Sequence, residues 1–468
     1  MALNRVLGSD GSKIMGNLEA NGRVFLVNTN GVLFGQGASV SVGGLVASTL
    51  DISDSDFAAG TYRFKGTGQN AAVLNQGTIT ATDGGAVALL GGTVSNQGTI
   101  IANRGSVALA AGNAMTLDFA GDGLLNVQVD EAVADALAEN HQLIRADGGQ
   151  VLLTANAGEA LLKTVVNNTG VIEARTLAEK DGKILLLGDF AGGMVSVAGT
   201  LDASAPDGGD GGFVDTSGAH VQIQNGARVT TLAADGETGT WLIDPTDFRV
   251  TAGEALQTAS SIGADTLMQN LGANNVRLAT VQTTGSLHVD APITWSASTT
   301  LTLAAQRNIN INADITATAG KLALEYGLSN TQNTAFYTNP YAYNLNNNAR
   351  INLSAGNNFS TKHGYNGPIR QFTVITSLGA AGSTDTTTLQ GMNGNLSGHY
   401  ALGADIDASV TSTWNSGDGF TPIAGGNDSF TGTLDGLGHT ITGLTINRPA
   451  LHNVGLFGQT LGGTVRNL

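Results

Sequence analysis

Aspartates gather at three places in the sequence, and clustered carboxylates support two kinds of chemistry. Paired carboxylates act as general acid and base in glycoside hydrolysis, and carboxylates on a loop can bind Ca²⁺. The three groups are Asp51, Asp54 and Asp56; Asp207, Asp210 and Asp215; and Asp405 and Asp407. A polysaccharide-active enzyme and a cation site are therefore the chemical functions that the sequence leaves open.

The local sequence around these groups indicates turns more than catalytic or metal-binding sites. Asp51, Asp54 and Asp56 follow a strand-like segment, where aspartate commonly forms a solvated turn, and they remain weak candidates for a metal site. The segment from Asp207 to Gly212 is similar to calcium-binding glycine repeats, but those repeats occur in tandem and this copy is single. We expect a plain turn there.

Other reactive side chains show no arrangement typical of an active site. The seven histidines contain no His-x-x-x-His pair, and the chain has no cysteine, nucleophile elbow, phosphate loop or dinucleotide fingerprint. His439 is expected to serve in a turn or a stacked contact. We predict that the protein is not an enzyme and holds no cofactor.

Composition narrows the class of protein. The chain has 468 residues, of which 66 are glycine, 12% are charged and 41% are hydrophobic, and its net charge is −16. The acidic balance argues against a nucleic-acid partner, and the spread of short Val/Ile/Leu runs argues against disorder. We therefore expect a core built from many small units.

An internal repeat predicts the fold that positions these residues. Asn75–Ala81 (NQGTITA) recurs as Asn96–Ala102 (NQGTIIA), and each copy is followed by a second strand-like element, Gly84–Leu90 and then Arg104–Ala110. A period of about 21 residues leaves no room for a helix in each repeat. The pattern predicts an all-β solenoid, a parallel β-helix, with glycine at corners that need positive φ.

One segment departs from this pattern. Residues 129–139 (VDEAVADALAE) have helix-forming composition and apolar residues three and four apart. We expect an excursion from the solenoid over residues 118–142, with a short helix near 130–140.

Ordered motifs in the first half of the chain resemble a known family. Ala2–Ser12, Val24–Gly35, Val42–Leu50 and Asn167–Ala174 are similar to blocks of the secretion domain of filamentous-haemagglutinin-type adhesins, the exoproteins of bacterial two-partner secretion. The resemblance implies a right-handed parallel β-helix and, for the full-length protein, an outer-membrane two-partner secretion transporter as partner. It also implies a secreted or cell-surface location.

The same resemblance assigns a role to one turn. The family has an Asn-Pro-Asn-Gly signature where this chain has Asn28, Thr29, Asn30 and Gly31, so we expect a structural turn of the secretion motif without the stiffening proline. The family also places a signal peptide and further secretion-domain residues ahead of the Ala2 block. We therefore expect Met1 to be a truncated start.

The far end carries a second resemblance. Tyr400–Asp407, Gly419–Ala424, Phe430–Ile441 and Asn453–Gly458 are similar to the Gly-Leu-Phe-Gly type repeats of large bacterial surface adhesins. The resemblance implies an incomplete repeat that continues beyond Leu468.

These patterns predict a division into six parts. They are a truncated secretion domain over 1–117, the excursion over 118–142, β-helix repeats over 143–239, a junction with further rungs over 240–325, an Asn/Tyr-rich irregular segment over 326–368, and a β-rich region with the adhesin repeat over 369–468.

The function that follows is attachment. We predict a rod-like adhesin that binds host cells, sister cells or a polysaccharide, and no nucleic acid. A polysaccharide-active β-helix enzyme and a carrier rod for a C-terminal toxin remain the alternatives.

Overall fold

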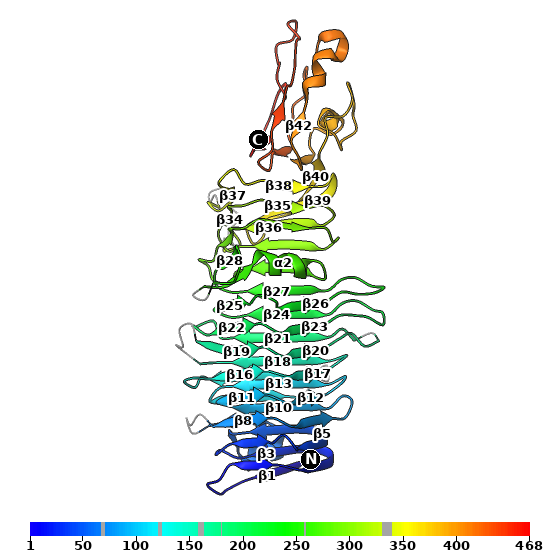
Figure 1. Ribbon diagram of the computed structural model, residues 1–468. Coiled ribbons are helices and arrows are strands. Elements are labelled where there is room, and N and C mark those ends of the chain that lie inside the picture. Colours follow the sequence, from blue (N-terminus) through cyan, green and yellow to red (C-terminus); the bar gives the residue numbers. More distant parts are fainter. Residues whose placement is uncertain (67–70, 120–123, 158–162, 179, 257–258, 330–338) are drawn as a thin grey trace. The chain divides into compact units, whose positions relative to one another are not determined.

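The structure is a computed structural model that describes residues 1–66, 71–119, 124–157, 163–178, 180–256, 259–329 and 339–468. It divides into two compact units, Met1–Gln282 (unit 1) and Thr283–Leu468 (unit 2). Strands dominate both units (Figure 1). Within the described residues, no helix combines the length and the apolar character needed to cross a membrane.

Unit 1 is a stack of coils in which each coil contributes strands to three parallel ladders. The first ladder consists of β1 (Ala2–Arg5), β3 (Asn17–Val27), β5 (Ser39–Ser48), β10 (Ala86–Gly91), β13 (Ser106–Ala111), β18 (Gln150–Ala155), β21 (Lys183–Gly188), β24 (Phe213–Ser217), β27 (Thr240–Asp244) and β30 (Asn275–Ala279). The second ladder starts on the first halves of β3 and β5 and continues through β9 (Thr78–Ala81), β12 (Thr99–Ile101), β17 (Leu143–Arg145), β20 (Val171–Glu173), β23 (Thr200–Asp202) and β26 (Arg228–Thr230).

The third ladder closes each coil. It contains β2 (Ser12–Ile14), β4 (Val32–Phe34), β8 (Ala72–Asn75), β11 (Thr93–Asn96), β16 (Leu137–Asn140), β19 (Thr164–Asn168), β22 (Met194–Val197), β25 (His220–Ile223), β29 (Ser261–Gly263) and β28 (Phe248–Thr251). Helix α2 (Ala264–Leu271) follows β29. Parallel strands stacked coil on coil confirm the predicted parallel β-helix.

Aligned apolar columns form the interior of unit 1. Because the strands pair in register, one residue of each first-ladder strand from β10 to β30 stacks on its equivalent in the next coil, and every member of this column is exposed by 1% or less. Burying one such side chain stabilises the fold by roughly 1.5–3 kcal/mol. The column contains Val87, Val107, Val151, Ile184, Val214, Trp241 and Val276.

Four asparagines form a hydrogen-bonded ladder in the same interior. Asn75 Nδ2 donates to Asn96 Oδ1 at 2.7 Å, Asn96 Nδ2 to Asn140 Oδ1 at 2.7 Å, and Asn140 Nδ2 to Asn168 Oδ1 at 2.8 Å. All four side chains are fully buried. Each amide thus satisfies its neighbour, which removes most of the cost of burying a polar group.

The glycine corners differ partly from the expectation. Gly84 (φ 78°) does have positive φ, but Arg104 occupies the equivalent position of the next coil at φ 55°. The following residue is glycine for another reason: a Cβ on Gly105 would lie 1.8 Å from the carbonyl oxygen of Gly85, and one on Gly149 would lie 2.0 Å from that of Gly105. Close approach of stacked backbones therefore demands glycine more strictly than φ does.

The predicted helix near 130–140 is wrong. The described part of the excursion forms β15 (Asn126–Glu131) and then β16 of the third ladder. β15 pairs antiparallel with β14 (Ala114–Asp118), and Val127 and Val129 pack on a buried cluster. This packing overrides the helix propensity of the segment. Residues 120–123 of the excursion lie outside the described residues.

Unit 2 begins with regular coils. Its three parallel ladders are β31 (Leu287–Val289), β34 (Ile309–Ile311) and β37 (Tyr343–Leu345); β32 (Ile293–Trp295), β35 (Ile315–Ala317) and β38 (Ile351–Leu353); and β33 (Thr300–Ala304), β36 (Lys321–Tyr326) and β39 (Gly356–His363). The structure thus differs from the expectation of an irregular segment over 326–368, because its described part contains β37, β38 and β39. Residues 330–338 lie outside the described residues.

The regular coils of unit 2 end at an antiparallel hairpin. β39 pairs antiparallel with β40 (Ile369–Ile375), after which the ladder becomes parallel again. The remaining elements are η1 (Gln390–Gly394), β41 (His399–Leu402), β42 (Ile406–Asp407), η2 (Ser409–Gly417), β43 (Thr433–Asp435), β44 (Ile441–Thr442) and β45 (Thr464–Arg466). They enclose a second core around Tyr400, Phe420 and Phe430.

Candidate functional site

The turn at residues 28–31 fixes the first coil of unit 1. Asn28 is fully buried, and its Nδ2 donates to the carbonyl oxygen of Asp10 at 3.0 Å and to Ser12 Oγ at 2.9 Å. Its Oδ1 accepts from the backbone N–H of Asn30 at 3.0 Å, which closes an Asx-turn. The side chain of Asn28 therefore shapes its own turn and at the same time holds the preceding loop.

The rest of the turn completes this attachment. Asn30 Nδ2 donates to the carbonyl oxygen of Gly8 at 2.8 Å, and the backbone N–H of Ser12 donates to the carbonyl oxygen of Gly31 at 2.9 Å. Gly31 has φ 119°, which requires glycine. Thr29 lies half-buried at the tip of the turn. Three of the four predicted motif residues, Asn28, Asn30 and Gly31, thus hold residues 8–12 against the second coil.

The aspartates of the 51–56 group face arginines. Arg5 Nε lies 2.8 Å from Asp51 Oδ1 and Arg5 Nη1 lies 2.7 Å from Asp54 Oδ1, while Arg63 Nη2 lies 3.2 Å from Asp56 Oδ1. Hydrogen bonding to Asp54 raises the pKa of Arg5. These carboxylates therefore form ion pairs with arginine side chains of the same protein. In the part of the chain that the structure describes, no group of three or more His, Asp or Glu residues could hold a metal ion.

Arg5 also links the first coil to a sheet outside the solenoid. This extra sheet has the order β15, β14, β7 (Tyr62–Lys65), β6 (Asp51–Ile52), all antiparallel, and helix α1 (Asp54–Ala59) connects β6 to β7. Ser53 Oγ accepts from the N–H of Asp56 and caps α1. In addition to the pairing of β1 and β2 with the next coil, side chains thus attach the first coil at two points, the Asn28 turn and the Arg5 ion pairs.

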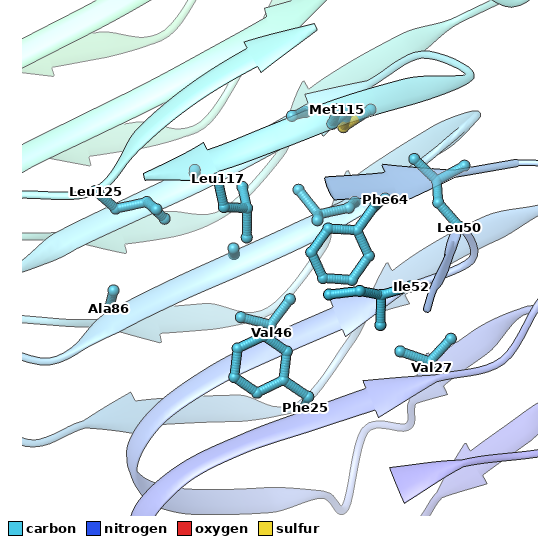
Figure 2. Close-up of a cluster of buried hydrophobic side chains, with 14 of the residues drawn as sticks. Phe25, Val27, Val46, Leu50, Ile52, Phe64, Ala86, Met115, Leu117 and Leu125 are labelled. Carbon is cyan, nitrogen blue, oxygen red and sulfur yellow. The ribbon is translucent and has the colours of Figure 1, made fainter. Parts of the chain in front are cut away.

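The extra sheet covers the outer face of the first ladder. Figure 2 shows Phe25 and Val46 of that ladder beside Phe64, Met115 and Leu117 of the extra sheet, and all are buried. The rings of Phe25 and Phe64 stack at 6.5 Å between centroids. The extra sheet therefore encloses a second hydrophobic layer outside the coil interior.

Sequence reasoning missed this layer, although a signal was present. A strand with one solvated face alternates apolar and polar residues, whereas β10 and β13 are apolar at nearly every position and buried at every position. Continuous apolar runs in a solenoid indicate that something covers the outer face.

The aspartates of the 207–215 group do not come together. Asp207 is exposed, and Asp210 Oδ1 accepts from the N–H of Glu237 at 2.8 Å. Asp215 instead lies near Asp244, which sequence reasoning missed. Burial raises the pKa of Asp215, and burial together with the negative charge of Asp215 raises the pKa of Asp244 to about 6.

Asp405 and Asp407 also serve different partners. Asp405 Oδ2 lies 2.7 Å from Arg350 Nη1, and the backbone N–H of Thr440 donates to Asp405 Oδ1 at 2.9 Å, which lowers the pKa of Asp405. Asp407 Oδ1 accepts from the N–H of Ser409 at 2.9 Å. His439 is buried, with Nε2 3.0 Å from the carbonyl oxygen of Ile351.

The fold and the attached first coil define a parallel β-helix with an antiparallel sheet on one face. Residues 1–203 match the family model described as the TPS secretion domain. This part of the chain is therefore similar to two-partner secretion domains, and the match supports a two-partner secretion exoprotein.

The chain is also similar to curated relatives over part of its length. The chain is 36% identical over 212 residues to a heme/hemopexin-binding protein of Haemophilus influenzae, and 31% identical over 199 residues to the protein of that name from a second strain; each alignment covers 40% of this chain. A 65-residue stretch, 13% of this chain and 1% of the relative, is 57% identical to halomucin of Haloquadratum walsbyi. The chain spans about a fifth of the length of the two Haemophilus relatives.

A solved structure is also similar. The crystal structure of the HMW1 secretion domain from Haemophilus influenzae is 23% identical, with a TM-score of 0.48, covering 74% of this chain and 83% of that chain.

Proposed function

We propose that the chain belongs to an exported exoprotein that crosses the outer membrane through a two-partner secretion transporter and then mediates attachment at the cell surface or in the medium. The observation that carries the proposal is the secretion-domain match over residues 1–203. The first coil, held by the Asn28 turn and by Arg5, and the extra sheet supply the surface features of that domain.

The composition supports export and attachment. A chain without cysteine can cross a membrane unfolded and fold outside without disulfide formation. Stacked coils then present loops along their length, and loops carried on a rigid scaffold are common binding surfaces. A non-enzymatic role agrees with the pairing of most aspartates in the three predicted groups with arginines or backbone amides.

Export is tested with the full-length protein produced with and without its cognate transporter. We expect the protein in the medium only when the transporter is present. Asn28→Ala removes the contacts to residues 10 and 12 and should lower secretion severalfold, whereas Asn21→Ala, an exposed asparagine of β3, should not. Secretion that does not depend on the transporter would falsify the proposal.

Attachment is tested with the purified chain on host cells, sister cells and immobilised polysaccharides. We expect saturable binding to at least one of these surfaces. Absence of binding across the panel would contradict the attachment role while leaving the export route intact.

Polysaccharide cleavage is a second candidate, and one observation favours it. Asp215 and Asp244 interact electrostatically on neighbouring strands, and the environment of Asp244 raises its pKa to about 6, as for the general acid of a glycosidase. A reducing-sugar assay on acidic glycans, with Asp244→Asn as the comparison, tests this role. Activity that Asp244→Asn retains in full would exclude the pair as the site.

A further inference from the structure

A cavity of about 380 Å³ lies inside unit 2, where the antiparallel hairpin interrupts the coils. This volume is within the roughly 300–1,000 Å³ range of small-molecule sites. The wall comes from five different strands, β36, β39, β40, β43 and β45. Residues on the wall include Tyr326, Thr361, Phe372, Thr433, Thr464 and Arg466.

The ladder order shows that the sheet curls around this cavity. β45 is five steps from β36 along the sequence of pairings, which in a flat sheet would separate them by about 24 Å. Both strands nevertheless line the same cavity, and the guanidinium of Arg466 lies 4.7 Å from the ring centroid of Tyr343, itself 5.6 Å from the ring of Tyr326. The cavity is therefore enclosed by the curl of one sheet.

A buried network holds this curl in place. Asp435 is fully buried and accepts from Arg466 Nε at 2.7 Å, from Asn467 Nδ2 at 3.0 Å, and from the hydroxyl of Tyr343. Burial, and then the negative charge of Asp435, raise the pKa of Tyr343, so the phenol stays protonated and donates. Arg466 is thus positioned before any ligand arrives, which lowers the entropic cost of binding.

The cavity wall is positively charged in a chain whose net charge is −16. Arg370, Arg466 and His363 line it, and no carboxylate is found among the described residues on its wall. Asp435, behind Arg466, is already engaged. Within the described residues, Arg370 has no ion pair with an aspartate or glutamate. The guanidinium of Arg370 is therefore available to an anion, and Arg466, whose Nε donates to Asp435, places a second guanidinium on the same wall.

Hydroxyl and ring groups complete the wall. Thr361 and Thr433 are buried, and their hydroxyls, like that of Thr464, have no hydrogen-bond partner in the described part of the chain. The ring of His363 stacks on Tyr326 at 4.8 Å. Unpaired hydroxyls beside a flat aromatic surface suit a ligand that carries its own hydroxyls on a ring.

We propose that this cavity binds a single acidic sugar unit of the uronic-acid type, with its carboxylate between Arg370 and Arg466 and its hydroxyls on the threonines. The inference gives the proposed attachment function a ligand class and rests on that function for its biological role. The binding itself is independent of export and of cells.

Calorimetric titration of the purified 468-residue chain with sodium galacturonate tests the proposal. We expect saturable binding of galacturonate and none of methyl galactoside, which lacks the charge. Arg370→Gln should weaken galacturonate binding about tenfold or more, because it removes a charge-assisted hydrogen bond. Lys362→Gln is the matched control: it removes one positive charge from the same hairpin at a residue that lies over Tyr365, outside the cavity wall.

The ring of His363 supplies a second measurement. Partial burial lowers the pKa of His363, a hydrogen bond involving the backbone of Tyr341 opposes this, and the positive charges of Arg466 and Arg370 lower it further. A bound carboxylate offsets those charges, so saturation with galacturonate should raise the pKa of His363 in an NMR titration. This shift should disappear in Arg370→Gln.

Three results would overturn the proposal: no saturable galacturonate binding, equal loss of binding in Arg370→Gln and Lys362→Gln, or binding of inorganic sulfate in place of the sugar. Galacturonate binding by a chain that attaches to no cell or polysaccharide would uphold the cavity assignment and overturn the attachment function instead.

Discussion

The two units bury different kinds of polar group. In the described residues of unit 1, every polar residue that is fully buried is neutral, and the Asn75–Asn168 ladder is typical of them. Unit 2 buries Asp435, His439 and Tyr343. Repetition explains the difference, because identical coils in register let each amide meet its own equivalent.

Irregular strands do not offer this solution. Once the β39–β40 hairpin breaks the parallel order, neighbouring strands no longer place like residues together, and the buried carboxylate of Asp435 is satisfied by an ion pair instead. The same irregularity leaves a cavity. Regular stacking therefore stabilises a solenoid without buried charges, whereas an interruption of the stacking leaves room for a ligand.

The largest effect is expected when the buried carboxylate of unit 2 is removed. Asp435→Ala leaves Arg466 and Tyr343 without their buried partner, so the unfolding free energy of unit 2 should fall by about 3–5 kcal/mol. Hydrogen exchange with peptide mapping measures the loss, which should be greatest in β37 and β45 and absent from unit 1. Asp428→Ala, at an exposed aspartate, is the control. Equal destabilisation by both variants would show that the network is unimportant.

The second-largest effect is expected from disturbing the close backbone stacking in unit 1. Gly105→Ala places a Cβ 1.8 Å from the carbonyl oxygen of Gly85, so the coils must separate at a cost of about 3 kcal/mol. Gly84→Ala meets nothing within 4 Å and should cost only about 1 kcal/mol, for the positive φ of that position. Chemical denaturation followed through Trp241 compares the two variants. A larger loss in Gly84→Ala would mean that φ decides which corners need glycine.

The neutral amide ladder gives a smaller effect. Asn96→Ala leaves the donor of Asn75 and the acceptor of Asn140 unsatisfied in the interior, which should cost about 2 kcal/mol. Gln97→Ala removes a similar bond, Gln76 Nε2 to Gln97 Oε1 at 3.1 Å, but on the exposed surface, where the loss should be within about 0.5 kcal/mol. Thermal unfolding distinguishes them, and equal shifts would argue against a role for burial.

The smallest effect concerns the one carboxyl of unit 1 whose pKa is raised to about 6, that of Asp244. Its ordinary value is 3.8, so the unfolded chain releases this proton first as the pH rises. Unit 1 should therefore lose stability between pH 4 and 6, on the order of 1 kcal/mol because the group is partly exposed. Asp244→Asn should flatten this part of the profile. If Asp244→Asn leaves the dependence of stability on pH unchanged, Asp244 does not cause the loss of stability between pH 4 and 6.

The coils could be predicted from sequence because their signal is local. Asn75–Ala81 and Asn96–Ala102 repeat the same residues, and the structure pairs them in register. The segment 129–139 misled because its helix propensity is local too. Its conformation is decided by the pairing of Val127 and Val129 with the preceding strand β14 and by their packing on a cluster that includes residues as distant in sequence as Phe25.

The candidate site was predictable to a lesser degree. The turn at residues 28–31 was found through its motif, but its partners Asp10 and Ser12 lie in the preceding coil. Asp215 and Asp244 are 29 positions apart, and only the pairing of β24 with β27 brings them near each other. The cavity of unit 2 depends on the curl of a sheet, which no short pattern encodes.

The asparagine ladder has a consequence for how such a chain can grow. Successive members are separated by 21, 44 and 28 residues, yet each bond is 2.7–2.8 Å long. The extra strands β14 and β15 lie within the 44-residue interval, so an insertion can leave the solenoid and return without shifting the next coil. Phe34 and Val197 stand at the two ends, where the ladder stops. The four amides thus act as fixed points between which segments of very different length can be accommodated.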